Sequence, residues 1–218
     1  MNSILHIYRS SVGKKIIMSL TGLFLCSFLV IHVSGNTLLF KDDGGKAFEQ
    51  YSEFMSTNGI IRTIEILLVA GLLFHIIDGV VLWLRNKRSR GGKYEMYKVS
   101  DNATLPSRIT FVTGSIIFIF LVVHIKTFVY VGRFVDVKPS MYELVVEAFS
   151  DPIYVLFYLV ALVLLAYHLH HGFQSAFQTL GLRHKKLDFL LNAIAVIFWL
   201  IIPIGFATMP IYFLLFYR

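Results

Sequence analysis

The sequence predicts an all-α membrane protein with five transmembrane helices, and two observations carry that prediction. Of the 218 residues, 56% are hydrophobic and 15% are charged, an apolar share above that of ordinary soluble domains. The apolar residues also form five runs, each long enough to cross about 30 Å of hydrocarbon as a helix. We expect one integral membrane domain over residues 1–218, with spans at about 16–40, 60–84, 109–131, 152–180 and 187–216.

The first run is expected to be a retained span, because it is too long for a signal-peptide core and no small-residue cleavage site follows it. The four connections between runs are short and polar, so none predicts a second globular domain. The fifth run contains Pro203 and Pro210, which predict a kink or an early end of that helix. The single cysteine, Cys26, excludes a disulfide framework and a cysteine-based metal site.

The charges outside the runs alternate in sign from one connection to the next. The N-terminal flank and the second and fourth connections are rich in Lys and Arg, and the first and third connections hold most of the acids. By the positive-inside rule, the N-terminus is expected on the cytoplasmic side. The pI near 9.5 is then explained by membrane orientation, and the basic residues accompany no nucleic-acid recognition motif.

Histidines end two copies of one apolar motif. Residues 21–32 read "TGLFLCSFLVIH" and residues 113–124 read "TGSIIFIFLVVH". At a rise of about 1.5 Å per residue, His32 and His124 are expected in the outer half of the membrane. The second and fourth runs cross the membrane in the opposite direction, toward the cytoplasm, and they place His75 and His168 nearer the cytoplasmic side. Four helices therefore supply two histidine pairs at two depths.

Such pairs match the needs of haem, because a low-spin haem iron takes two axial imidazoles from opposite sides. Two levels in one helical bundle predict two b-type haems, with His32 and His124 on one and His75 and His168 on the other. Small residues near these histidines are expected to make space for a flat macrocycle. These haem-packing candidates are Thr21, Gly22, Gly79, Thr113, Gly114 and Gly172.

Two alternatives stay open at this point. His171 competes with His168 for the ligand role in the fourth run, and only the match between "HIIDG" and "HLHHG" favours His168. His170 points to the opposite side of that helix and is expected at a packing or lipid-facing position. A haem-free transporter that uses the histidines as a proton relay is the main rival, although such transporters more usually show broken helices and inverted repeats.

Four segments carry a family resemblance: "SSVGKKIIMSLTGLFLCSFLVIHVSGN", "FHIIDG", "VVHI" and "YHLHHGFQSAF". With five spans, they resemble the di-haem cytochrome b membrane anchor of succinate dehydrogenases and fumarate reductases, the single-subunit five-helix type. The resemblance covers nearly the whole chain. It implies that His32 and His124 hold the distal haem, and that His75 and His168 hold the proximal one.

The resemblance also implies partners and a location. A flavoprotein subunit and an iron-sulfur subunit would dock on the cytoplasmic side of a bacterial inner membrane, with "RNKRSRGGK" as a candidate docking surface. The chain would exchange electrons with menaquinone and would not turn over succinate alone. A cytochrome b of another membrane dehydrogenase, of the hydrogenase or formate dehydrogenase type, is the alternative. The direction of the reaction, the quinone type and the number of complexes in an assembly stay open.

Polar residues in the spans are the quinone-site candidates, since quinone reduction needs a proton source. Glu65 is the first, with Arg62 as its alternative ion-pair partner, and Asp78 is the second. Lys126 is a candidate for pairing with a haem propionate or for reaching outward to the interface. Some fumarate-reducing members of the resembled family carry a Glu where this chain has Ala166, which puts a built-in proton path in doubt.

Overall fold

The computed structural model describes residues 10–89, 105–135 and 139–216. Within these ranges every regular element is a helix, and there is no strand. Two of the long rods are single uninterrupted α-helices, α4 (Gly59–Ser89) and α9 (Pro152–Thr179). The other long rods join several elements. They are α2 (Ser11–Asn36) with η1 (Thr37–Phe40), α6 (Leu105–His124) with η2 (Ile125–Tyr130) and α7 (Val131–Phe134), and α10 (Asp188–Val196) with η3 (Ile197–Ile201) and α11 (Ile202–Phe216).

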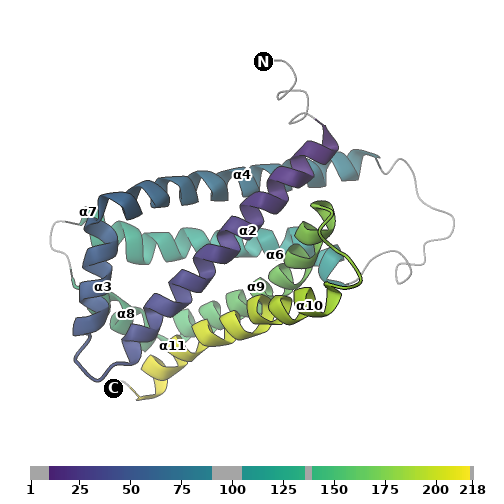
Figure 1. Ribbon diagram of the computed structural model, residues 1–218. Helices are drawn as coiled ribbons and strands as arrows, with labels where there is room; N and C mark the ends of the chain where they lie inside the picture. The colour runs from purple at the N-terminus through teal and green to yellow at the C-terminus, as the bar shows by residue number, and fades with distance from the viewer. Residues whose placement is uncertain (1–9, 90–104, 136–138, 217–218) are drawn as a thin grey trace.

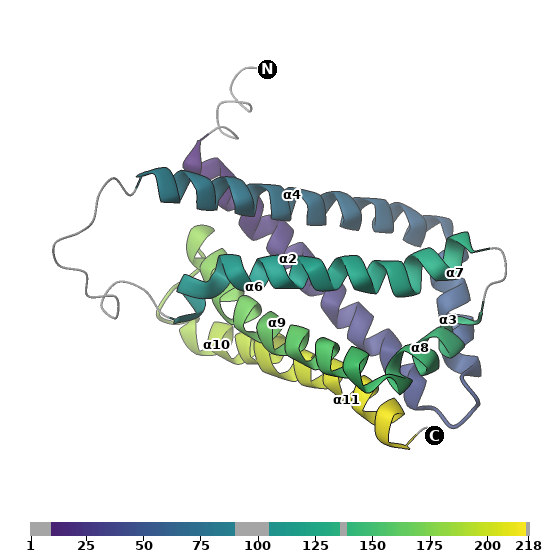
Figure 2. The ribbon, with the colours of Figure 1, turned by 180° about the vertical axis from the view of Figure 1, so that it is seen from behind.

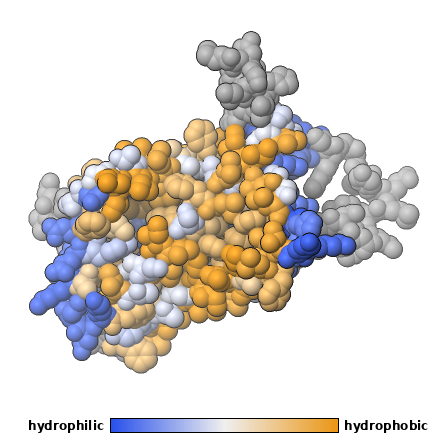
Figure 3. Space-filling model, viewed as in Figure 1, coloured by the Kyte–Doolittle hydropathy of each residue, from blue (hydrophilic) through white to orange (hydrophobic). Residues whose placement is uncertain are grey.

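The predicted fold class is confirmed as far as helices and spans are concerned. Among the described residues, five helices are long and apolar enough to cross a membrane: Ser11–Phe40, Gly59–Arg88, Ile109–Phe134, Pro152–Thr179 and Asp188–Phe216. Apolar side chains cover the middle of the molecule, and polar side chains gather at its two ends (Figure 3). The chain is therefore a multi-pass membrane protein.

We name the two ends of the bundle by their charges. The basic end is where α2 begins and where α4 and α9 end. The acidic end is the opposite one. Described basic residues at the first are Lys14, Lys15, Arg85, Lys87, Arg88, Arg183, Lys185 and Lys186. Described acidic residues at the second are Asp42, Asp43, Glu49, Glu53, Glu143, Glu147 and Asp151. The other basic residues of the second connection lie largely outside the described ranges.

Four helices surround the centre of the bundle (Figures 1 and 2). α2 packs along α4 and α9, α9 packs along α6, and α4 and α6 barely touch. α2 therefore lies diagonally opposite α6, and α4 lies opposite α9. The fifth rod, α10 to α11, packs on the outside against α9 and α2.

Two short helices close the acidic end, in connections that the sequence analysis treated only as polar. They are α3 (Lys46–Thr57) and α8 (Met141–Ser150). α8 begins with a capping box between Ser140 and Glu143, which satisfies free amide groups of its first turn. Both helices are amphipathic, and their apolar faces join one core with α9 and α11. The buried members contributed by α3 and α8 are Phe48, Leu144, Val145 and Phe149.

The fifth rod does not end early, although the two prolines allowed that outcome. A π-helical turn at Ile197–Ile201 directly precedes Pro203, and the helix then continues to Phe216 with Pro210 inside it. Proline lacks the amide hydrogen of a regular helix, and a π-turn is a known way for a helix to absorb such a local irregularity. The rod therefore spans the full height of the bundle.

Candidate functional site

The four histidines from the two depths face each other in two pairs. The acidic-end pair is His32 on α2 and His124 on α6, with ring centroids 5.9 Å apart and planes at 88°. The basic-end pair is His75 on α4 and His168 on α9, with centroids 6.3 Å apart and planes at 72°. Each pair joins diagonally opposite helices, so both cross the centre of the bundle.

Both separations suit a single metal ion between two imidazoles. A bound imidazole nitrogen lies about 2.0 Å from a transition metal. The ring centroid lies about 1.1 Å further out, so two opposed ligands place their centroids about 6 Å apart. Among the described residues, no group of three or more His, Cys, Asp and Glu side chains is placed to hold a metal ion. The donor sets are therefore pairs, which suits an iron whose other four positions a porphyrin fills.

The pairs occupy two separate levels. His75 packs against Gly22 on α2, and Gly22 precedes His32 by ten residues on the same helix. This distance corresponds to about 15 Å along the helix axis. The two levels expected from the sequence are thus present in the packed bundle.

The repeated Thr-Gly step lies beside the basic-end pair in both halves of the chain. An added Cβ would lie 3.2 Å from His75 Cε1 at Gly22, and 3.3 Å from His168 Cε1 at Gly114. The Thr21 hydroxyl oxygen lies 3.3 Å from His75 Nδ1. Thr113 repeats this contact with His168 Nδ1 at 3.4 Å. These residues were expected to make room for a macrocycle, and the room at both glycines is taken by a histidine ring.

The acidic-end pair has different neighbours, which sequence reasoning missed. Tyr158 on α9 is buried, and its hydroxyl lies 2.5 Å from His124 Nδ1. Asn36 places its amide nitrogen 3.4 Å from His32 Nδ1 and donates to the His32 carbonyl at 2.9 Å. Tyr158 precedes His168 by ten residues, so the same depth argument applied to tyrosines would have found it.

Aromatic rings surround the acidic-end pair, His32 and His124. Phe28 stacks on His32 with centroids 5.1 Å apart, and Phe206 of α11 lies 5.3 Å from the same ring. His124 contacts Phe120 and Phe128. The fifth rod therefore helps to build this level of the bundle.

The other candidate residues near the basic-end pair, two glycines and two histidines, have different surroundings. Gly172 has nothing within 4 Å of an added Cβ, whereas Gly79 meets the Met18 methyl at 3.2 Å. Open space therefore exists at Gly172, one turn after His168 on α9. His170 packs edge-on against Trp199 of the fifth rod, which is the first of the two positions expected for it, packing or lipid-facing. His168, and not His171, supplies the ring opposite His75.

A buried ion pair lies on the basic side of His75. Lys14 Nζ lies 3.0 Å from Asp78 Oδ1, and the two side chains are 7% and 0% exposed. Asp78 is three residues after His75 on α4, one turn closer to the basic end. The quinone-site candidate Asp78 is thus bound to a lysine that the sequence analysis counted among the flanking charges.

Glu65 binds two arginines at the acidic end. Arg133 of α7 holds both carboxylate oxygens, at 2.5 and 3.1 Å, and Arg62 binds one of them. The expected partner Arg62 is present, and Arg133, which spans the seam between α4 and α6, was missed. Lys126 is exposed. A groove of about 320 Å³ begins at this cluster and follows α4, lined by Arg62, Glu65, Ile66, Val69, Ala70 and Leu73.

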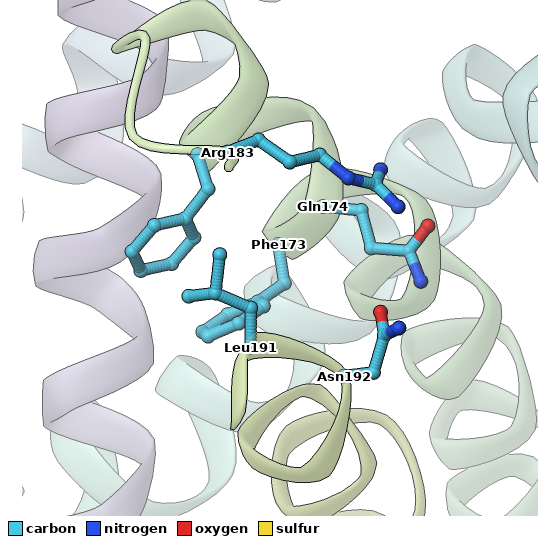
Figure 4. A pocket seen from close by; sticks show the side chains of 6 residues that line it. Phe173, Gln174, Arg183, Leu191 and Asn192 are labelled. Atoms are coloured by element: carbon cyan, nitrogen blue, oxygen red, sulfur yellow. The ribbon is translucent and has the colours of Figure 1, made fainter. Parts of the chain in front are cut away.

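A second recess lies between α9 and α10 near the basic end (Figure 4). The polar ends of Arg183, Gln174 and Asn192 gather on one side of it, and Phe173 and Leu191 lie behind them. Its volume is about 10 Å³, which is room for about one water molecule. This recess is too small for an organic ligand.

Comparison with protein-family models, with curated proteins and with solved structures found no match to this chain. Its residues and their geometry are therefore the basis for assigning a function.

Proposed function

We propose that this chain is the di-haem cytochrome b membrane anchor of a succinate:quinone oxidoreductase, passing electrons between an iron-sulfur subunit and menaquinone. The observation that supports it most is the presence of two histidine pairs, with ring centroids 5.9 and 6.3 Å apart, on the two diagonals of one bundle. A lone intramembrane histidine has many uses, but two opposed pairs at two levels match bis-imidazole haem ligation.

The ligands in this proposal are His32 and His124 for the distal haem and His75 and His168 for the proximal one. A bound haem supplies a one-electron Fe(II)/Fe(III) couple. The chain itself would hold these four imidazoles in position between apolar helices. Its two levels, about 15 Å apart along α2, give electrons a route along the bundle axis.

The charge distribution supports an orientation for the complex. We infer that the basic end faces the cytoplasm of a bacterium, where the flavoprotein and iron-sulfur subunits bind. Support comes from the exposed cations Arg85, Lys87 and Arg88 after α4 and Lys185 and Lys186 before α10. Most of "RNKRSRGGK" lies outside the described residues.

For the quinone, we infer a site at the groove along α4. Its volume of about 320 Å³ falls in the range of small-molecule sites. Glu65 lies at its acidic end, and the apolar side chains Val69 and Leu73 follow along it. In this proposal Glu65 is the proton-exchanging group, and Arg62 and Arg133 hold its carboxylate.

The haem assignment is tested by spectra of the purified chain. We expect two b-type haems per chain in reduced-minus-oxidised spectra. Single alanine variants at His32, His75, His124 and His168 should each lose one haem, and His171→Ala is the matched control that keeps both. Spectra without haem would contradict the proposal and favour a haem-free transporter.

The choice of dehydrogenase is tested by purification from the native membrane. Co-purification with a flavoprotein and an iron-sulfur subunit, together with succinate:quinone activity, is the expected result. Recovery of hydrogenase or formate dehydrogenase subunits would overturn this part and leave the haem assignment intact.

A further inference from the structure

We propose that Thr21 and Thr113 are positioning residues that hold His75 and His168 as the Nδ1-protonated tautomer, with the Nε2 lone pair free to bind a metal. The importance of this tautomer for haem binding rests on the proposed function. The tautomer itself follows from the hydrogen bonds around the two rings.

The first ring shows the chemistry most directly. The Thr21 hydroxyl donates its only hydrogen to the backbone, to the Ile17 carbonyl at 2.8 Å with the Met18 carbonyl at 3.1 Å. Its oxygen therefore turns a lone pair toward His75 Nδ1, which lies 3.3 Å away. An oxygen that has already used its hydrogen only accepts, so Nδ1 must carry the proton.

The second ring repeats the arrangement in the other half of the chain. The Thr113 hydroxyl donates to the Thr110 carbonyl at 3.0 Å, and its oxygen lies 3.4 Å from His168 Nδ1. This threonine oxygen has likewise used its hydrogen, so it accepts from Nδ1, and both rings favour the same tautomer.

The glycines fix where each ring lies. Gly22 and Gly114 allow the Cε1 atoms of His75 and His168 to approach the backbone of the neighbouring helix closely. Each threonine immediately precedes its glycine, so one Thr-Gly step supplies both the space and the hydrogen-bond acceptor. Each copy of the motif thus positions the histidine of the next membrane-spanning helix, His75 on α4 or His168 on α9.

The acidic-end pair shows that this arrangement is not a general feature of the bundle. The Asn36 amide nitrogen donates to the His32 carbonyl at 2.9 Å, which fixes the orientation of the amide, and the same nitrogen lies 3.4 Å from His32 Nδ1. A donor beside Nδ1 favours the opposite tautomer. Tyr158 beside His124 is able to donate or accept. Only the basic-end pair is set in advance for binding through Nε2.

The consequence concerns metal ligation. A neutral imidazole with hydrogen on Nδ1 presents its Nε2 lone pair, and a hydrogen bond from Nδ1 to an acceptor raises the basicity of the ligand. His75 and His168 need no change of tautomer when they bind iron. Removing the acceptor should lower ligand basicity and raise the midpoint potential of the metal held by that pair.

The test uses the full chain in detergent with ¹⁵N-labelled histidine. In protein freed of haem, ¹⁵N chemical shifts should show His75 and His168 protonated on Nδ1. Thr21→Val should raise the Nε2-protonated fraction at His75 alone, and Thr113→Val at His168 alone. Thr208→Val is the matched control, since Thr208 also donates to a backbone carbonyl, that of Gly205 at 2.6 Å, at an exposed position of α11.

In haem-loaded protein, the same valine variants should shift one midpoint potential upward and leave the other unmoved, and Thr21→Ser should restore the first. Nε2 protonation of both rings in the unmodified protein would overturn the inference, as would equal effects of Thr21→Val and Thr208→Val. A chain that binds no haem contradicts the proposed function, while the tautomer measurement still decides this inference.

Discussion

The two histidine pairs differ in what holds them, although one duplicated motif contributes to both. At the basic end, each ring is held by a Thr-Gly step on the neighbouring helix, in the same way in both halves of the chain. At the acidic end, His32 and His124 have unlike neighbours, Asn36 and Tyr158. Both halves of the chain thus supply a histidine at each level, but only at the basic end do they supply the same hydrogen-bond neighbour. We expect the two levels to respond differently to substitution.

The largest effect should come from the buried ion pair between Lys14 and Asp78, which lies one turn from His75 at the basic level. Asp78→Asn leaves the Lys14 ammonium buried without its carboxylate, and we expect the free energy of unfolding to fall by about 3 kcal/mol. Denaturant titration of the purified chain measures it. Asp188→Asn is the matched control, since the Arg183–Asp188 pair is 40% exposed on both sides and should change stability by less than about 1 kcal/mol. Equal effects of the two substitutions would contradict the prediction.

The second prediction separates the histidine contact from ordinary helix packing. Gly22→Ala places a Cβ 3.2 Å from His75 Cε1, which should displace the ring from His168 and weaken haem binding at the basic level by about tenfold or more. Gly114→Ala should act in the same way through His168. Haem content and spectra of each variant measure the loss.

Gly71→Ala is the control for this substitution. Its Cβ would lie 3.2 Å from Phe24 Cδ1, between the same two helices, α2 and α4. Helix packing should suffer equally, and both haems should stay bound. Loss of a haem from Gly71→Ala would mean that helix separation, and not the histidine contact, governs binding.

The helices were predictable because each span is a long apolar run, and the ends expected from hydropathy lie within about five residues of those observed. α3 and α8 were not expected as helices, since each is too short to cross the membrane and lies in a connection between apolar runs. The prolines of the fifth run left its continuation open. The helix continues past Pro203 after a π-turn at Ile197–Ile201, which packs against α9.

The site was predictable where residue number translates into depth along a single helix. The pairing of His32 with His124 and of His75 with His168 followed from depth and is seen in the bundle. Contacts between helices were not accessible in this way. The sequence placed Gly22 at the level of the basic-end pair without showing that a ring from α4 would fill the space beside it.

The third prediction concerns the acidic level alone. Tyr158→Phe removes the hydroxyl beside His124 Nδ1 and should weaken haem binding at this level about fivefold, the effect of one neutral hydrogen bond. Tyr212→Phe is the matched control, because the Tyr212 ring lies at the same end of the bundle and packs against Phe40 and Phe213. Rates of haem transfer to an acceptor protein distinguish the levels. A change at the basic level in Tyr158→Phe would contradict the independence of the two pairs.

The smallest effect is expected at Asn36, and its sign is informative. The Asn36 amide places a donor beside His32 Nδ1, so binding through Nε2 must work against the tautomer that this donor favours. Asn36→Ala removes the donor, and haem binding at the acidic level should tighten by about twofold or less, since a single weak contact is lost. Thr37→Ala is the matched control, because Thr37 also bonds to the preceding turn of α2. Weaker binding in Asn36→Ala alone would show that the amide supports His32, and the difference between the levels would then be one of strength and not of tautomer.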